Sequence, residues 1–92
     1  MYTFHEDPGH GWLEVPIKEI RDLDIADQIS SYSYLNNGHV YLKEDCDLTK
    51  YLFAKFPGDG YHFETLKFFS ESVTTKHYNH SCVIRQMDRF RE

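Results

Sequence analysis

The stretch DPGHGWLEVP (residues 7–16) decides how the chain starts to fold, because a tight turn leads directly into a β-prone run. Pro8 fixes its own φ near about −65°, while the two glycines are free to take positive φ. The run that follows contains the only tryptophan, Trp12, and alternates in the manner of a strand. Together with a short strand expected over residues 2–5, this stretch predicts an N-terminal β-hairpin.

A second hairpin is predicted from the triplet Asn36-Asn37-Gly38. Asn-Gly supplies the two positive-φ residues of a type I′ turn. Residues 31–35 before the turn alternate serine with tyrosine, and residues 39–43 after it place Val40 and Leu42 on one side. The two runs are therefore expected to pair antiparallel across the turn.

Helices are expected over residues 16–24 and 47–56, where apolar side chains recur every three or four positions. Pro16 suits the first position of the first helix, and Pro57-Gly58 ends the second. Between them, residues 25–29 are expected to form a further helical turn, or a loop, that buries its two isoleucines. The apolar stripes consist of Ile17, Ile20 and Leu23 in the first helix and of Leu48, Tyr51, Leu52 and Phe56 in the second.

The C-terminal half is less regular. Residues 61–69 alternate for most of their length and predict a strand, whereas residues 71–80 are polar and predict a loop. Residues 81–90 fit either a strand or a helix, and a strand is the preferred interpretation. The whole chain, residues 1–92, is thus predicted to be a single α+β domain, with an antiparallel sheet of five or six strands and two helices packed on one face.

Composition indicates an ordered domain of 92 residues with one aromatic-rich core, since 40% of the residues are hydrophobic and 16% aromatic. The sequence lacks both an apolar run of about 18 residues and a signal peptide, so a cytoplasmic location without membrane contact is expected. Cys46 and Cys82 are then expected to remain reduced. Residues 1–48 contain ten acidic and three basic side chains, while residues 49–92 contain five acidic and seven basic ones.

Three carboxylates, Glu44, Asp45 and Asp47, immediately precede the second predicted helix. Asp47 or Asp45 can cap its free N–H groups, where negative charge is favourable. A cation site built from the three carboxylates is the alternative, but the glycine and the distal glutamate of a calcium loop are missing. The structural role is therefore preferred.

The histidines suggest a zinc site only weakly. His77, His80 and Cys82 form one irregular cluster, which His5 and His10 would have to complete, and structural zinc sites usually have two paired-ligand elements. No nucleophile elbow, phosphate loop or dinucleotide motif is present, and three neighbouring carboxylates would raise the pKa of the Cys46 thiol. The sequence therefore predicts a non-enzymatic protein without a cofactor.

Basic and aromatic side chains are interleaved in the C-terminal third, a combination that neutralises phosphates and stacks on bases. The overall net charge of −5 argues against free DNA as the main partner. A local contact with RNA inside a ribonucleoprotein remains compatible with both facts. The residues concerned are Lys67, Phe68, Phe69, Lys76, Tyr78, Arg85, Arg89, Phe90 and Arg91.

Three blocks of the N-terminal half, in order, carry a resemblance to a family of small phage- and plasmid-borne proteins of mostly unassigned function. They are DPGHGWLEVP at residues 7–16, ISSYSY at residues 29–34 and VYLKEDCD at residues 40–47. In the second half only Ile84-Arg85 matches. The chain departs from the family at Asp24, where a glycine is usual, so the first helix is expected to end differently.

The resemblance implies a function. Small proteins of mobile elements often inhibit host defence, and in size and acidity this chain is similar to anti-CRISPR proteins that act on type I-F surveillance complexes. The implied partners are subunits of that complex and its guide RNA, and the alternative is a small nucleic-acid- or zinc-binding accessory protein. The expected contact residues are Asp22, Asp24, Asp27, Tyr32, Tyr34, Lys76, Arg85, Arg89 and Arg91.

Overall fold

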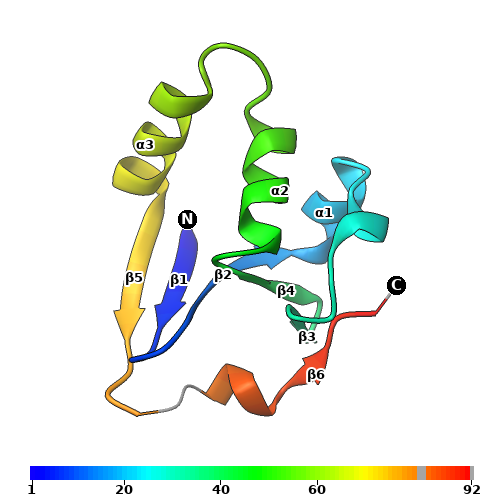
Figure 1. Cartoon of the computed structure of the whole chain (residues 1–92), viewed down its shortest axis with the longest axis vertical. Coiled ribbons are helices and arrows are strands. Elements are labelled where there is room, and N and C mark those ends of the chain that lie inside the picture. Colours follow the sequence, from blue (N-terminus) through cyan, green and yellow to red (C-terminus); the bar gives the residue numbers. More distant parts are fainter. Residues whose placement is uncertain (81–82, 92) are drawn as a thin grey trace.

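The computed structural model describes residues 1–80 and 83–91, which form one mixed six-stranded sheet with the strand order β5-β1-β2-β4-β3-β6 and three α-helices (Figure 1). The predicted α+β class is therefore confirmed. The strands are β1 (Tyr2–Glu6), β2 (Gly11–Pro16), β3 (Tyr34–Asn36), β4 (His39–Lys43), β5 (Val73–His77) and β6 (Asp88–Arg89), and the helices are α1 (Ile17–Asp22), α2 (Asp47–Lys55) and α3 (Tyr61–Ser72).

Both predicted hairpins are confirmed, but the first strand of the second hairpin is shorter than predicted: β3 begins at Tyr34, and residues 31–33 form a turn and not a strand. In the first turn, the Asp7 carboxylate accepts hydrogen bonds from the backbone N–H groups of Gly9 and His10, each at 3.0 Å. In the second turn, Asn37 and Gly38 have φ values of 51° and 78°, as a type I′ turn requires. Pairing of β2 with β4 joins the two hairpins into the centre of the sheet.

The two predicted helices are confirmed to within two residues at either end. Between them, a short 3₁₀ helix over Ala26–Gln28 lets Ile25 and Ile29 enter the core, as expected. Asp24 lies just beyond α1 with a φ of 60°, in the left-handed region that glycine adopts most easily. The helix therefore ends at an aspartate that adopts a conformation favoured by glycine.

The strand predicted for residues 61–69 is wrong, because this segment belongs to helix α3. Phe68 is buried there, but Phe63 and Leu66 are 68% and 72% exposed. Apolar residues therefore occupy both the inner and the outer face of the helix. Together they produce a sequence pattern that resembles the alternation of a strand. The strand prediction fails because this alternation indicates a strand only if every large apolar side chain of the segment is buried.

The loop predicted for residues 71–80 is also partly wrong, since β5 runs from Val73 to His77 and pairs in parallel with β1. The sheet is consequently mixed and not purely antiparallel. Of the strand predicted for residues 81–90, Ser81 and Cys82 lie outside the described residues. The rest contains a 3₁₀ helix over Val83–Gln86 and the two-residue strand β6, so the strand prediction holds only at its end.

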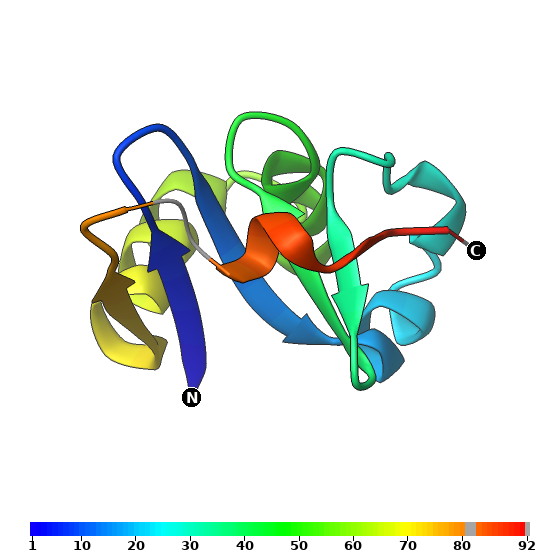
Figure 2. The same cartoon turned by 90° about the horizontal axis from the view of Figure 1, so that it is seen from below.

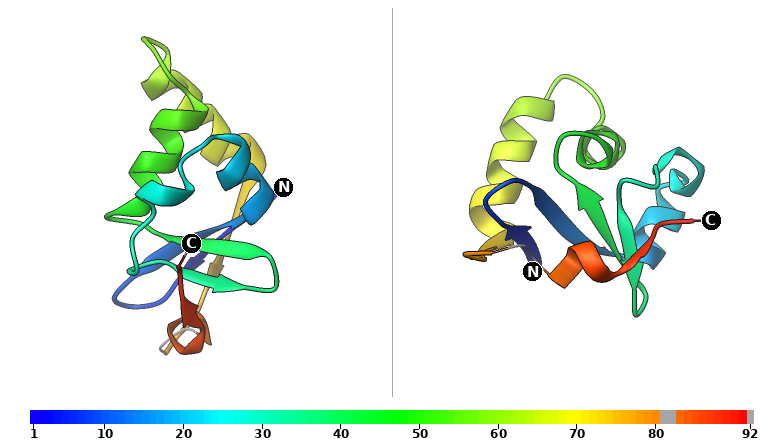
Figure 3. Two further views of the ribbon diagram at one scale, coloured as in Figure 1. Left: turned by 90° about the vertical axis from the view of Figure 1, so that its right-hand side faces the viewer. Right: turned by 60° about the horizontal axis from the view of Figure 1, so that its bottom comes forward.

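The sheet has two differently covered faces (Figures 2 and 3). The three α-helices lie on one side, and the C-terminal segment with its 3₁₀ helix crosses the other. The larger core lies under the helices and includes Leu13, Val15, Val40, Leu42, Ile20, Tyr51 and Phe68. A smaller cluster under the C-terminal segment consists of Trp12, Tyr34, Tyr41 and Ile84. The second face carries the candidate site.

Candidate binding surface

Side chains from four strands gather on the sheet face under the C-terminal segment. The register pairs Trp12 with Lys43 and Tyr34 with Arg89, so these four side chains emerge on the same face. With Tyr32, Arg85 and His10 they line a cavity of about 220 Å³. We call this cavity, with its seven lining residues, the aromatic–cationic groove.

Each cation of the groove lies against an aromatic ring. Lys43 Nζ and Arg85 Cζ lie 6.0 and 5.8 Å from the centroid of the Trp12 ring, and Arg89 Cζ lies 5.5 Å from that of Tyr34. Arg89 also donates a hydrogen bond of 2.8 Å to the carbonyl oxygen of Ser31. These contacts hold the positive charges in fixed positions beside the rings.

Arg85 is anchored by the first turn of the chain. Its Nε and Nη2 atoms each donate a 2.8 Å hydrogen bond to the Asp7 carboxylate, whose side chain is fully buried. The same carboxylate holds the turn closed, as described above. The sequence indicated Asp7 only as a turn residue, and no local signal connects it with an arginine so distant in the chain. One carboxylate thus links the N-terminal hairpin to the C-terminal half of the groove.

Trp12 lies at the bottom of the groove and is only 2% exposed. Its indole N–H is the one buried side-chain polar group, among residues 1–80 and 83–91, without a hydrogen-bond partner. An unpaired buried donor is unfavourable by about 1–3 kcal/mol. The floor of the groove therefore contains an unpaired donor, which an acceptor reaches only when the side chains that cover it move aside.

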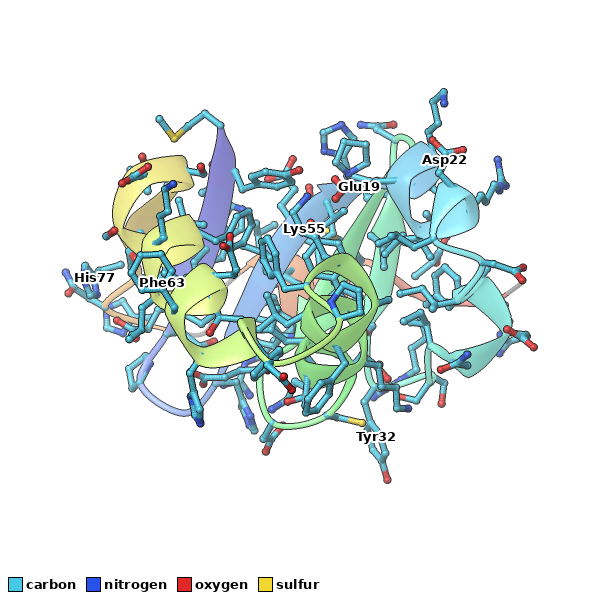
Figure 4. All side chains as sticks on the ribbon, turned by 90° about the horizontal axis from the view of Figure 1, so that it is seen from above. Glu19, Asp22, Tyr32, Lys55, Phe63 and His77 are labelled. Atoms are coloured by element: carbon cyan, nitrogen blue, oxygen red, sulfur yellow. The ribbon has the colours of Figure 1, made fainter. Side chains whose placement is uncertain are left out.

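Tyr32 forms an aromatic rim between two hollows (Figure 4). Its side chain is 64% exposed and points away from the body of the domain. It lines the groove on one side and, on the other, a second hollow of about 390 Å³ that is shared with His10, Lys43, Asp45 and Cys46. The ring is therefore reachable beside two separate cavities.

A hydrogen-bonded carboxylate lies farther along the same face. The two Glu14 oxygens bond to His5 Nε2 at 2.9 Å and to His39 Nδ1 at 2.6 Å, and His5 Nδ1 bonds to the Tyr78 hydroxyl at 2.9 Å. Burial by itself raises the pKa of Glu14, but the two histidine contacts outweigh it and hold the pKa below its ordinary value. Glu14 therefore stays ionised and keeps both rings in place.

Four of the nine expected contact residues meet in the groove, namely Tyr32, Tyr34, Arg85 and Arg89. Arg91 lines a neighbouring hollow with Arg89, and Lys76 lies on β5 with its Nζ 5.2 Å from the Tyr78 ring centroid. The three acids are exposed and form a patch at the end of α1 and in the following 3₁₀ helix. Figure 4 shows Asp22 of this patch well apart from Tyr32. This acidic patch consists of Asp22, Asp24 and Asp27.

The groove also contains residues that sequence reasoning missed. Trp12 was indicated as a strand residue and Lys43 as the end of a strand, without a place in a site. Period-two alternation predicts that each points to one face of its strand, but only the pairing of β2 with β4 brings them together. A signal for their proximity was absent from the sequence.

The weakly suggested zinc site can be followed only in part, because one of its ligands lies outside the described residues. Among the described residues, no group of three histidine, cysteine, aspartate or glutamate side chains is placed to hold a metal ion. His77 Nδ1 instead contacts the Glu6 carboxylate at 2.6 Å, Asp45 pairs with Lys43 at 2.9 Å, and Cys82 lies outside the described residues.

The capping role predicted for Asp47 or Asp45 is wrong, because α2 begins without a side-chain cap. The Asp47 carboxylate is fully buried and accepts hydrogen bonds from Ser30, Ser33 and Lys50. Burial raises the pKa of Asp47, but these bonds outweigh it and lower the pKa. Asp47 therefore binds the loop before β3 to the start of α2.

Comparison of the chain with protein-family models, curated proteins and solved structures found no match. Within the described part of the chain, no helix has the length and apolar character needed to cross a membrane.

Proposed function

We propose that this protein acts by binding, as a mobile-element inhibitor of a host defence system in the host cytoplasm. In its most specific form, the proposal is an anti-CRISPR protein that blocks recognition of target DNA by a type I-F surveillance complex. The observation that carries the proposal is the aromatic–cationic groove, where two arginines lie beside a buried tryptophan and two tyrosines. Tryptophan, tyrosine and arginine are the residues that contribute most binding energy at protein interfaces.

The distribution of charge supports a partner with both protein and nucleic-acid surfaces. The acidic patch of Asp22, Asp24 and Asp27 is exposed and lies apart from the groove. Such a patch attracts a lysine-rich surface of the kind that receives target DNA, while the groove suits a negatively charged neighbour. One small domain then contacts two oppositely charged parts of the same complex.

The size of the protein is sufficient for stoichiometric inhibition. A stable interface buries about 1,200–2,000 Å² in total, or about half of that on each partner. The accessible surface of this chain is 5789 Å², so the interface would cover a modest fraction of it. The groove with one adjoining surface can provide this area.

The test is a titration of a purified type I-F surveillance complex with the protein, with binding of labelled target DNA as the readout. We expect inhibition to be complete near one protein per complex and to weaken in the triple variant D22N/D24N/D27N and in R89Q. The control is Lys67→Gln. The sequence grouped Lys67 with the interleaved cations, but it lies on α3, on the opposite side of the sheet from the groove, so this variant removes one charge outside both surfaces. Inhibition at far below one equivalent would indicate catalysis, and absence of capture by the complex would refute the proposal.

The second candidate is a nucleic-acid-binding accessory protein of a mobile element, and the same interleaved rings and cations favour it. It predicts binding to nucleic acid without any defence complex. The zinc-binding form of this alternative has no support among the described residues. Elemental analysis of the purified full chain tests it directly.

A further inference from the structure

We infer that the aromatic–cationic groove, together with the exposed ring of Tyr32, is a site for a short segment of single-stranded RNA. The inference deepens the proposed function, because it names guide RNA as the chemistry that the groove contacts within a surveillance complex. Its evidence is the arrangement of rings, cations and one unpaired donor. Each of these features supports a different part of the ligand.

The cations suit phosphate groups. Arg89 is exposed and uses one N–H for the Ser31 carbonyl, so other guanidinium donors remain for a ligand. Lys43 forms an ion pair with Asp45, and Arg85 forms one with Asp7. Only part of the positive charge of each side chain is therefore left unbalanced. The groove therefore has enough positive charge for one or two phosphates and too little for a long duplex backbone.

The rings suit bases. Tyr32 separates two hollows and is exposed, so one base can stack beside its ring while the strand continues past Lys43. Stacking on a tyrosine does not require a particular base, because every base has a flat aromatic face. An acidic peptide satisfies the cations but offers a ring to Tyr32 only where it contains an aromatic side chain, whereas every nucleotide carries a base. The rings thus favour a nucleic acid over an acidic protein segment.

The floor suits a hydrogen-bond acceptor. The indole N–H of Trp12 has no partner within the described residues, although the side chain is 2% exposed. A phosphate or base oxygen that enters between the cations removes this unfavourable state once the side chains covering the N–H have moved aside. The net charge of −5 repels the remainder of a nucleic acid, which limits the contact to a short single-stranded stretch.

The test uses Trp12 as its own reporter, because it is the only tryptophan of the chain. The full-length protein is titrated with a six-nucleotide adenosine RNA, and tryptophan fluorescence and heat of binding are recorded. We expect saturable binding. The logarithm of the association constant should fall linearly with the logarithm of the salt concentration, with a slope of about −0.7 to −1.4, because one or two phosphates are neutralised. Hexaglutamate and inorganic phosphate are expected to bind much more weakly.

Two variants locate the site. Tyr32→Ala is expected to weaken RNA binding by about 5- to 100-fold, which corresponds to the loss of one stacked base. Arg89→Gln is expected to weaken binding and to flatten the salt dependence, whereas Lys67→Gln leaves both unchanged. Tyr32 and Lys67 are exposed, so these variants retain the fold, and matching thermal unfolding verifies this.

Three outcomes overturn the inference: no saturable binding of RNA, equal binding of hexaglutamate, or unchanged RNA affinity in Tyr32→Ala. The proposed function is judged separately, from capture of the protein by the surveillance complex. Capture without RNA binding refutes only the RNA site. RNA binding without capture refutes the inhibitor proposal and favours the accessory protein.

Discussion

Replacement of Asp47 by asparagine tests whether one buried carboxylate holds the domain together. Asparagine keeps the size and shape of the side chain but has a single acceptor oxygen and no charge. In the protein, one Asp47 oxygen accepts from the Ser30 and Ser33 hydroxyls at 2.7 and 2.5 Å. The other accepts from the Ser30 N–H at 3.0 Å and from Lys50 Nζ at 3.1 Å.

The expected loss follows from these partners. If the asparagine oxygen keeps the Ser30 N–H, its NH₂ group faces two hydroxyls that already accept from the N–H groups of Tyr32 and Lys43. Two charge-assisted hydrogen bonds are then lost or weakened, each contributing about 1.5–3 kcal/mol, and part is recovered when the hydroxyls rotate. We expect Asp47→Asn to lower the free energy of unfolding by about 3 kcal/mol.

The measurement is urea unfolding followed by circular dichroism. With a slope of about 1 kcal/mol per molar urea for a chain of this size, the midpoint falls by about 3 M in Asp47→Asn. Asp45→Asn is the matched control, because its carboxylate is 77% exposed and its ion pair with Lys43 lies at the surface. Exposed ion pairs contribute little to stability, so we expect no shift there. A midpoint within about 0.5 M of the parent would refute the reasoning, because uncharged packing would then suffice at this position.

Three further changes have predicted outcomes. Arg85→Gln removes the side chain that makes two hydrogen bonds to the buried Asp7 carboxylate. We expect it to lower the free energy of unfolding by about 1–3 kcal/mol in thermal or urea unfolding, and the control Arg91→Gln to leave it unchanged. An equal loss in both variants contradicts the role of Asp7. Asp24→Gly is expected to stabilise the domain by about 0.5–1 kcal/mol, because glycine adopts the φ of 60° without strain, and a lower melting temperature would contradict this. The pKa values of Glu14, Glu19 and Asp47 all lie below their ordinary values, so the folded state binds these protons less readily than the unfolded chain. The three carboxylates therefore contribute stability to the folded state at neutral pH. This stability is lost as the pH falls below about 5 and through the pKa values of the folded state. Urea midpoints measured from pH 7 to pH 3 should therefore decrease, with a smaller decrease in Asp47→Asn, and a midpoint independent of pH would disprove the linkage.

The local parts of the fold were predictable from the sequence. The type I′ turn needs two residues with positive φ, and Asn37-Gly38 provides them without help from distant contacts. The helix at residues 47–55 was found because Leu48, Tyr51 and Leu52 recur at helical spacing and are all buried, although Phe53 is apolar and exposed. In such segments, the apolar side chains that recur with the period of the element are the ones that become buried. The sequence pattern is then sufficient to predict the element.

The remaining parts depend on contacts that the sequence does not display. Helix α3 was mistaken because Phe63 and Leu66 are apolar and exposed, so period and burial disagree. Strand β5 was missed because Thr74 and Thr75 form a strand only where β1 offers its free edge. Of the groove, the sequence proposed Tyr32, Tyr34, Arg85 and Arg89 as contact residues. That they lie together with Trp12 and Lys43 follows only from the strand order.

The bond between Asp7 and Arg85 closes a loop of 78 residues, and this affects when the groove can form during synthesis. The two hairpins form from neighbouring residues and are fast, whereas the bond between Asp7 and Arg85 must wait until residue 85 has left the ribosome. A nascent chain that ends before residue 83 has most of its sheet but lacks both arginines of the groove. The groove is therefore completed later than the sheet that supports it.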